Sequence, residues 1–241
     1  MEKKKSGKLK YAVLLAVFFA GGYLYLNLGG LITRTAEKIA SGALGVAVNI
    51  GSIDVSLADK NVTVNTLQIG NPPGYKNKYA ITSEKIHIGL NTASKQLIDF
   101  KDIRVEGSVV NLEVNEHGSN LLDLKKLAAG KPQKESVGSE QVRVIVQNMV
   151  IGASTLNPSV TLLNREIKPI KMPALNISGI GKGGGGVAAG DAIVQILGKY
   201  INAAQSQASQ AGMLQGLPTN VGDVGKAIEE LDGNRLKGLF K

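Results

Sequence analysis

The chain has 241 residues, no Cys, two His and a formal net charge of +9. The absence of Cys excludes disulfides, thiolate catalysis and thiolate metal sites, and two distant His residues do not supply a His-based metal site. Aromatic residues make up only 4% of the chain and 30 residues are Gly, which suits thin strands and frequent turns better than a large aromatic core. Residues 1–10 carry five Lys against one Glu, so much of the excess charge sits in this tail, and we expect no nucleic-acid binding.

The N-terminal stretch predicts a membrane anchor. Residues 11–32 contain no charged side chain and are apolar almost throughout, close to the length that spans a bilayer. We therefore expect a cytoplasmic basic tail at 1–10 and an uncleaved single-pass anchor at 11–30. Lys residues on the N-terminal flank predict that the remainder of the chain is exported. The alternative is a cleaved signal peptide, with Ala20 and Gly22 as the small residues before the cut.

Residues 46–114 are the part of the chain with the strongest β-pattern. Apolar residues fall on alternate positions there, as in Ile53, Val55 and Leu57, which places them on one face of a pleated strand. An amphipathic helix at 31–45 is expected before them. The pattern predicts antiparallel strands at about 46–57, 60–70, 79–91, 98–106 and 108–114. The NPPGY turn at 71–75 ends the second strand, because Pro cannot donate to the ladder.

The second half of the chain alternates between helical and strand patterns. Leu121, Leu124 and Leu127 predict a helix with Ser119 or Asn120 as its N-cap. A loop follows at 131–140, strand patterning then resumes, and the Gly-rich segment 181–186 ends the sheet. The expected fold is α+β and mainly β, with one transmembrane helix, a twisted antiparallel β-groove or sandwich, and C-terminal helices. The β domain with its leading helix covers 31–187, and the C-terminal helical region covers 188–241.

No segment carries a recognisable catalytic motif. The run GIGKGGGG has neither the order of a phosphate-binding loop nor a Ser or Thr after Lys182. Asp99 and Asp102 point to opposite faces of a strand, so their spacing does not form an acid–base pair. His87 and His117 have no identifiable triad partner. We expect no enzyme activity, no cofactor and no metal.

Several short motifs resemble the N-terminal module of the AsmA-like family of bacterial envelope proteins. They are a helix ending in Leu44-Gly45-Val46, the turn Asn71-Pro72-Pro73-Gly74, and a closing run with Ile103, Val105, Gly107, Val110, Leu112, Gly118, Asn120 and Leu121. The resemblance covers residues 11–127 and extends loosely to about residue 180. It implies a protein anchored in the bacterial inner membrane, with its N-terminus in the cytoplasm and its main domain in the periplasm.

The resemblance also implies a β-groove that shields lipid acyl chains, in support of lipid transport or outer-membrane maintenance. Long family members repeat the groove, whereas this chain has one short sheet, so a short shuttle, adaptor or scaffold subunit is expected. The candidate lipid-binding residues are apolar strand positions, and one bulge would reverse the face on which those beyond it lie. They are Val48, Ile50, Val55, Leu57, Val62, Val64, Ile86, Ile88, Val105, Leu112, Val142 and Val144.

Other interpretations of the same pattern stay open. The apolar strand face can equally form the core of an ordinary sandwich. The protein can be a membrane-tethered scaffold or adaptor that docks an envelope protein partner through 188–241. A third reading is a jelly-roll subunit of lipopolysaccharide transport, which would need an open strand edge.

Overall fold

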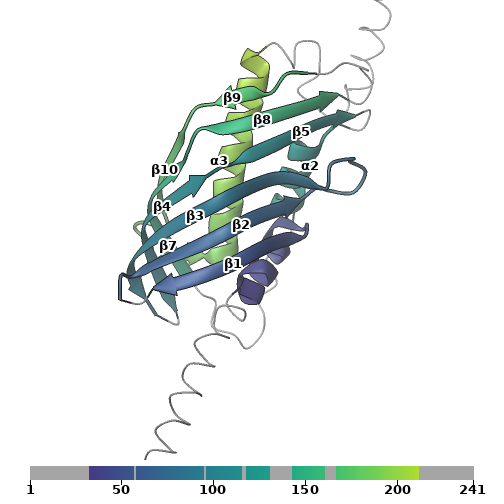
Figure 1. Cartoon of the computed structure of the whole chain (residues 1–241). Helices are drawn as coiled ribbons and strands as arrows, with labels where there is room; N and C mark the ends of the chain where they lie inside the picture. Colours follow the sequence, from purple (N-terminus) through teal and green to yellow (C-terminus); the bar gives the residue numbers. More distant parts are fainter. Residues whose placement is uncertain are drawn as a thin grey trace, which may run out of the picture.

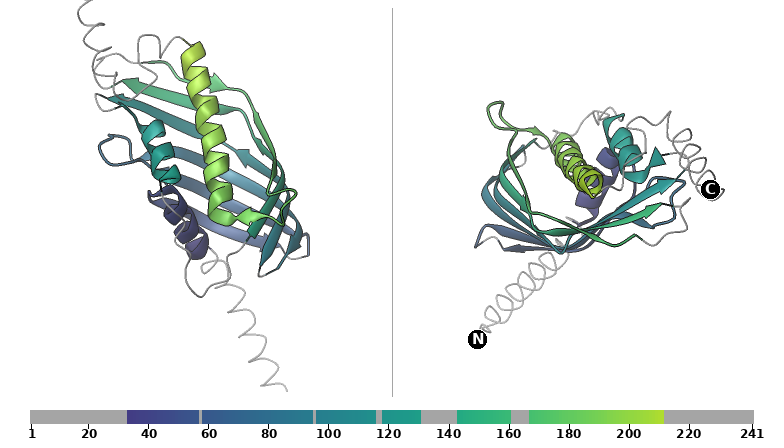
Figure 2. Two further views of the ribbon diagram at one scale, coloured as in Figure 1. Left: turned by 180° about the vertical axis from the view of Figure 1, so that it is seen from behind. Right: turned by 90° about the horizontal axis from the view of Figure 1, so that it is seen from above.

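The computed structural model describes residues 33–56, 58–94, 96–115, 118–130, 143–160 and 167–211. Within these residues the fold is α+β and mainly β: one strongly curved sheet with helices lying against its inner face (Figures 1 and 2). The strands are β1 (Val48–Ser56), β2 (Asn61–Gly70), β3 (Tyr79–Ala93), β4 (Leu97–Glu106), β5 (Val109–Asn115), β6 (Gly118–Ser119), β7 (Arg143–Ile151), β8 (Ser154–Val160), β9 (Ile170–Met172), β10 (Leu175–Ile180) and β11 (Val187–Ala188). The helices are a leading helix at 33–44, α2 (Asn120–Ala129) and α3 (Ala189–Gln210).

The predicted strands, the leading helix, α2 and the start of the C-terminal helical region are confirmed within a few residues. The N-terminal tail and anchor at 1–30, and the helical pattern after residue 211, lie outside the described residues. Among the residues that the structure describes, no helix is long and apolar enough to cross a membrane.

The sheet is not wholly antiparallel, which corrects the expectation. β1, β2, β3 and β4 pair antiparallel in chain order, but β4 pairs parallel with β7, and β5 pairs parallel with β8. The connection between β5 and β7 explains the difference. It includes α2, and a parallel neighbour requires a crossover long enough to carry the chain back along the sheet.

One transverse line, which we call the crease, crosses the whole sheet. At this line the spacing of the inward-facing residues is three instead of two, so two consecutive residues point outward together. The pairs lie within β1, β2 and β3 and at the junctions of β4 with β5, β7 with β8 and β9 with β10, and all of them are exposed or half-buried. The pairs are 51–52, 65–66, 84–85, 106–107, 152–153 and 173–174.

Backbone conformation marks the crease at two places. Thr66 has φ 58°, which is unusual for a β-branched residue, and Gly107 has φ 61°. A Cβ on Gly51, opposite Thr66 in the register, would lie 2.9 Å from the carbonyl oxygen of Asn65. The crease therefore has local backbone causes and is not a smooth bend.

Helix α3 lies diagonally over the inner face of the sheet, against β7 to β11 (Figure 2). Ile201, Ala204 and Ala208 on its apolar stripe are fully buried, and Leu197 and Tyr200 are each 5% exposed. Ala211, directly after the helix, is exposed. Burial of this stripe on the sheet is what holds the helix, because an isolated helix of this composition is marginal in water.

The leading helix runs back along the edge of the sheet. Ser41 Oγ accepts a hydrogen bond from Val48 N at 2.9 Å, and Glu37 Oε1 accepts one from Ile50 N at 2.7 Å. Two backbone donors at the start of the edge strand β1 are therefore satisfied by side chains, which protects this part of the edge from pairing with another chain. Glu37 contacts Ile50, which is next to the crease, whereas Ser41 contacts Val48, which is farther from it. The start of the helix therefore lies toward the crease.

The NPPGY turn is fixed to β5 and α2. The buried carboxylate of Glu113 accepts hydrogen bonds from Lys76 N at 2.7 Å and from Asn77 N and Asn77 Nδ2 at 3.0 Å each. Tyr75 donates from its hydroxyl to Asp123 Oδ2 at 2.6 Å. The 71–78 loop is therefore held by side chains that lie far from it in the sequence.

Candidate functional site

The inner face beyond the crease forms two continuous apolar rows. Strand register places Val55, Val62, Ile88, Ile103 and Met149 side by side in one row. Ile53, Val64, Ile86, Val105 and Ile151 form the next row. The alternation predicted from the sequence therefore resolves into one shared apolar surface over five strands.

Part of this surface is not fully covered. We define the open corner as Val55, Val62, Ile86, Ile88, Ile98 and Phe100, all of which are half-buried, whereas Val144, Val146 and Ile177 beneath α3 are buried. The elements against which α3 packs are β7 to β11 and α2, which leaves β1 to β4 beside it. The open corner is thus a partly exposed apolar patch on the inner side of a curved sheet.

A small polar cluster lies where the crease meets α3. Ser83, Ser108 and Ser154 are buried and come from neighbouring positions on three strand lines. The Tyr200 hydroxyl is 2.8 Å from Ser108 Oγ, and Ser83 Oγ donates to Ser108 Oγ at 3.3 Å. Burial raises the pKa of Tyr200, and its hydrogen bonds with Ser108 and Ser154 partly offset that rise. This cluster orients α3 on the sheet, because an unpaired hydroxyl at this depth would be costly.

The structure places the predicted lipid-binding residues in three settings. Val48, Val64, Val105, Leu112 and Val144 are buried, and all of them except Val64 belong to the main core. Half-buried positions are Ile50, Val55, Val62, Ile86 and Ile88. Leu57 and Val142 lie outside the described residues. The second group is the one available to a ligand, and four of its members form most of the open corner.

Sequence reasoning missed Ile98, Phe100 and the serine cluster. Ile98 and Phe100 lie in the predicted fourth strand with apolar spacing of two, so the alternation itself could have identified them. No pattern in the sequence indicated the serine cluster. Ser108 and Tyr200 are 92 positions apart in the sequence and meet only because α3 crosses the crease.

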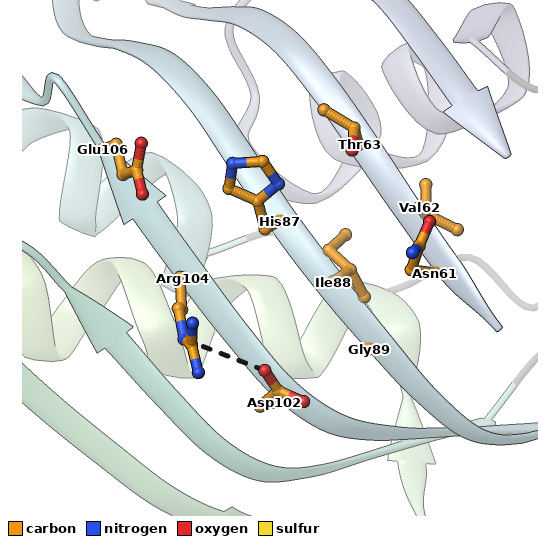
Figure 3. A pocket seen from close by; sticks show the side chains of 9 residues that line it. All are labelled: Asn61, Val62, Thr63, His87, Ile88, Gly89, Asp102, Arg104 and Glu106. Carbon is orange, nitrogen blue, oxygen red and sulfur yellow. Dashed lines mark ion pairs between the residues drawn. The ribbon is translucent and has the colours of Figure 1, made fainter. Parts of the chain in front are cut away.

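The outer face carries a polar hollow of about 370 Å³ over β2, β3 and β4 (Figure 3). Its polar side chains come from Asn61, Thr63, His87, Asp102, Arg104 and Glu106. Asp102 Oδ2 is 3.9 Å from Arg104 Nε, and both side chains are well exposed. Opposite charges on a solvated strand face explain this arrangement without a ligand.

Among the described residues, no cluster of three or more His, Asp or Glu residues could hold a metal ion. No protein-family model, no curated protein and no solved structure matches the chain.

Proposed function

We propose that this is a non-enzymatic protein, anchored in the bacterial inner membrane, whose periplasmic β domain holds a lipid acyl chain against the open corner and so supports lipid transport or outer-membrane maintenance. The observation that carries the proposal is the partly exposed apolar surface on a concave sheet face. Water-exposed apolar area is unfavourable by about 25 cal/mol per Å². An acyl chain laid along Val62 and Ile88 would remove that area from water.

The residues that line the open corner suit a flexible chain. They are mainly Val and Ile, so they offer a smooth apolar wall without a charged or hydrogen-bonding group to select a rigid ligand. The polar outer face of the same strands would keep the protein soluble around the bound chain. The alternation of strand residues therefore provides one face for lipid and one face for water.

Strand alternation also provides the sharpest experiment. Because the native chain has no Cys, a single Cys can carry a benzophenone photocrosslinker at a chosen position. We would place it at Ile88→Cys or Val62→Cys on the inner face. His87→Cys and Thr63→Cys, one residue away on the outer face, serve as matched controls. The full chain would be irradiated in bacterial membranes and analysed by mass spectrometry.

Lipid adducts at the two inner positions and none at the two outer positions are the expected result. Adducts of equal yield on both faces would show non-specific contact with the bilayer. Absence of lipid adducts at both inner positions in a folded protein would refute the proposal.

The scaffold alternative depends on different residues. The apolar stripe of α3 is already packed on the sheet, so a partner that docks here would meet the polar side of the helix, with Gln195, Lys199 and Asn202. Charge-altering substitutions at these three exposed positions, which leave the buried stripe and the open corner unchanged, separate the two functions. Loss of partner recovery with unchanged lipid adducts would favour the scaffold.

A further inference from the structure

Four lysine residues gather at one end of the molecule, and we call this group the lysine end. Lys76 and Lys78 lie in the 71–78 loop, and Lys125 and Lys126 lie on α2; all four are exposed. The loop between β2 and β3 and helix α2 lie side by side in both views of the fold (Figures 1 and 2). The bond from Tyr75 to Asp123, at 2.6 Å, ties the two segments together.

The acidic side chains close to the lysine end are already occupied. Glu113 is 2% exposed and accepts three hydrogen bonds from Lys76 and Asn77 through their N–H groups. Asp123 accepts from Tyr75 and lies 3.4 Å from Lys126 Nζ. Among the described residues, the ammonium groups of Lys76 and Lys78 form no ion pair with an acidic side chain, and Lys78 Nζ lies 5.0 Å from the centroid of the Tyr79 ring.

The lysine end is also preorganised. Its loop is fixed by backbone bonds to Glu113, and Asn115 Nδ2 donates to Gly74 O at 3.2 Å. A charged surface that is already ordered loses little conformational entropy when it binds. The exposed tip at Pro73 and Gly74 is therefore presented in one conformation.

Positive side chains at the opposite end of the strands are more dispersed. Lys60 follows Asp59, and Lys101 lies between Asp99 and Asp102 in the sequence. Arg143 and Lys182 also lie at that end, where Arg143 donates to carbonyl oxygens of the Gly-rich segment. The start of the leading helix lies toward the crease, so it points away from the lysine end.

We propose that the lysine end binds a bilayer surface that carries anionic lipid headgroups, on the side of the molecule away from the start of the leading helix. An anionic bilayer attracts lysine side chains through their hydrated charges, and this attraction needs no shaped pocket. A protein partner is less well matched, because stable protein interfaces have a buried aromatic or apolar centre. The exposed large hydrophobic residues of the described chain are Ile39 and Val150, and neither lies at this end.

The test uses the full chain reconstituted in nanodiscs of neutral phosphatidylcholine. Binding to separate vesicles is measured by flotation, with vesicles of phosphatidylcholine alone or with roughly 30% phosphatidylglycerol. The variant K76Q/K78Q/K125Q/K126Q removes the four charges. The control variant K60Q/K85Q/K101Q/K182Q removes the same number of exposed charges elsewhere on the described sheet and loops.

We expect the native chain to float with anionic vesicles at about 0.1 M salt and to be released at about 0.5 M. The first variant should bind several hundredfold more weakly, since each of the four lysines contributes about fivefold, and the control variant should bind within about twofold of the native chain. Equal losses in both variants would show that only net charge matters and would overturn the proposal. Binding of soluble polyglutamate without binding of anionic vesicles would also overturn it, in favour of an acidic protein partner. Thermal unfolding of both variants confirms that they are folded.

Discussion

Asn120 Nδ2 donates to Asn71 Oδ1 at 2.7 Å, which joins the NPPGY turn to the start of α2 across 49 positions of sequence. The same side chain also serves the part of β5 between its pairing with β3 and its pairing with β6: its Oδ1 accepts from Glu113 N at 2.8 Å, and its Nδ2 donates to Asn111 O at 2.7 Å. Asn120 thus acts as a short substitute for a neighbouring strand. Two of the motifs that carry the AsmA-like resemblance are in direct contact.

Asn120→Ala is expected to destabilise the fold strongly. It leaves the buried groups Glu113 N and Asn111 O without partners, which costs about 1–3 kcal/mol for each group. We expect the free energy of unfolding, measured with urea, to fall by about 3 kcal/mol. Asn49→Ala, at an exposed position of β1, should change it by less than about 0.5 kcal/mol. Similar small changes in both variants would contradict the role assigned to Asn120.

Glu113→Gln tests the carboxylate that holds the 71–78 loop. The substitution keeps the size of the side chain but replaces one acceptor oxygen with an NH₂ group, which faces the N–H donors of Lys76 or Asn77. We expect a loss of about 2 kcal/mol, because charge-assisted hydrogen bonds to a carboxylate are replaced by an unfavourable donor–donor contact. Hydrogen exchange should accelerate at the amides of Lys76 and Asn77 while the amides of β7 stay protected. Unchanged exchange at both loop amides would refute this account.

Two tyrosines with raised pKa values, Tyr75 and Tyr200, predict a loss of stability at alkaline pH. Burial, followed by the hydrogen bond to Asp123, raises the pKa of Tyr75, and burial raises that of Tyr200. The folded state therefore keeps these protons at pH values where the unfolded chain releases them. Their contribution to stability is complete below the ordinary tyrosine pKa of about 10 and decreases as the pH rises above it.

The variants Tyr75→Phe and Tyr200→Phe measure this effect. Each should lower the free energy of unfolding by about 1 kcal/mol at pH 8, through the loss of one hydrogen bond. Each should also show a smaller further decrease between about pH 8 and pH 11 than the native chain. Parallel pH profiles for the native chain and both variants would rule out these tyrosines as the cause.

Thr66 offers a substitution that should stabilise the protein. Its φ of 58° places a β-branched residue in the left-handed region, at a cost of about 1–2 kcal/mol. Asn tolerates that region better, so Thr66→Asn should raise the free energy of unfolding by about 1 kcal/mol. Thr63→Asn, in the regular part of the same strand, should lower it, because Asn is disfavoured in strands. A loss of stability in Thr66→Asn would show that contacts of the Thr66 side chain outweigh the backbone strain.

The alternation of apolar residues was sufficient to predict the strands, since it records which side of each strand is buried. Val62, Val64, Ile86 and Ile88 show it without interruption, and their predicted inward orientation agrees with the register. The order of the strands in the sheet could not be predicted from this alternation. Parallel pairing of β4 with β7 depends on the path of the chain through α2, and no local pattern in Arg143–Ile151 distinguishes a parallel from an antiparallel neighbour.

The candidate site was predictable only as a surface. Alternation identified the residues that share the inner face, but their exposure depends on where α3 lies. Val144 and Ile88 have the same pattern and differ because the helix covers the first and not the second. The Tyr200 contact that orients α3 joins residues 92 positions apart, and nothing near Ser108 indicates it.

The crease constrains how this chain can change length. β1, β2 and β3 reverse the side on which their residues lie at the same row, and the junctions of β4 with β5, β7 with β8 and β9 with β10 do the same. One residue inserted beside Gly51, or in the β7–β8 junction at Gly152, would turn the residues that follow to the wrong face while the neighbouring strands kept their orientation. Length changes should therefore be confined to the turns at the two ends of the sheet, and the row from Gly51 to Gly152 should keep a constant residue count.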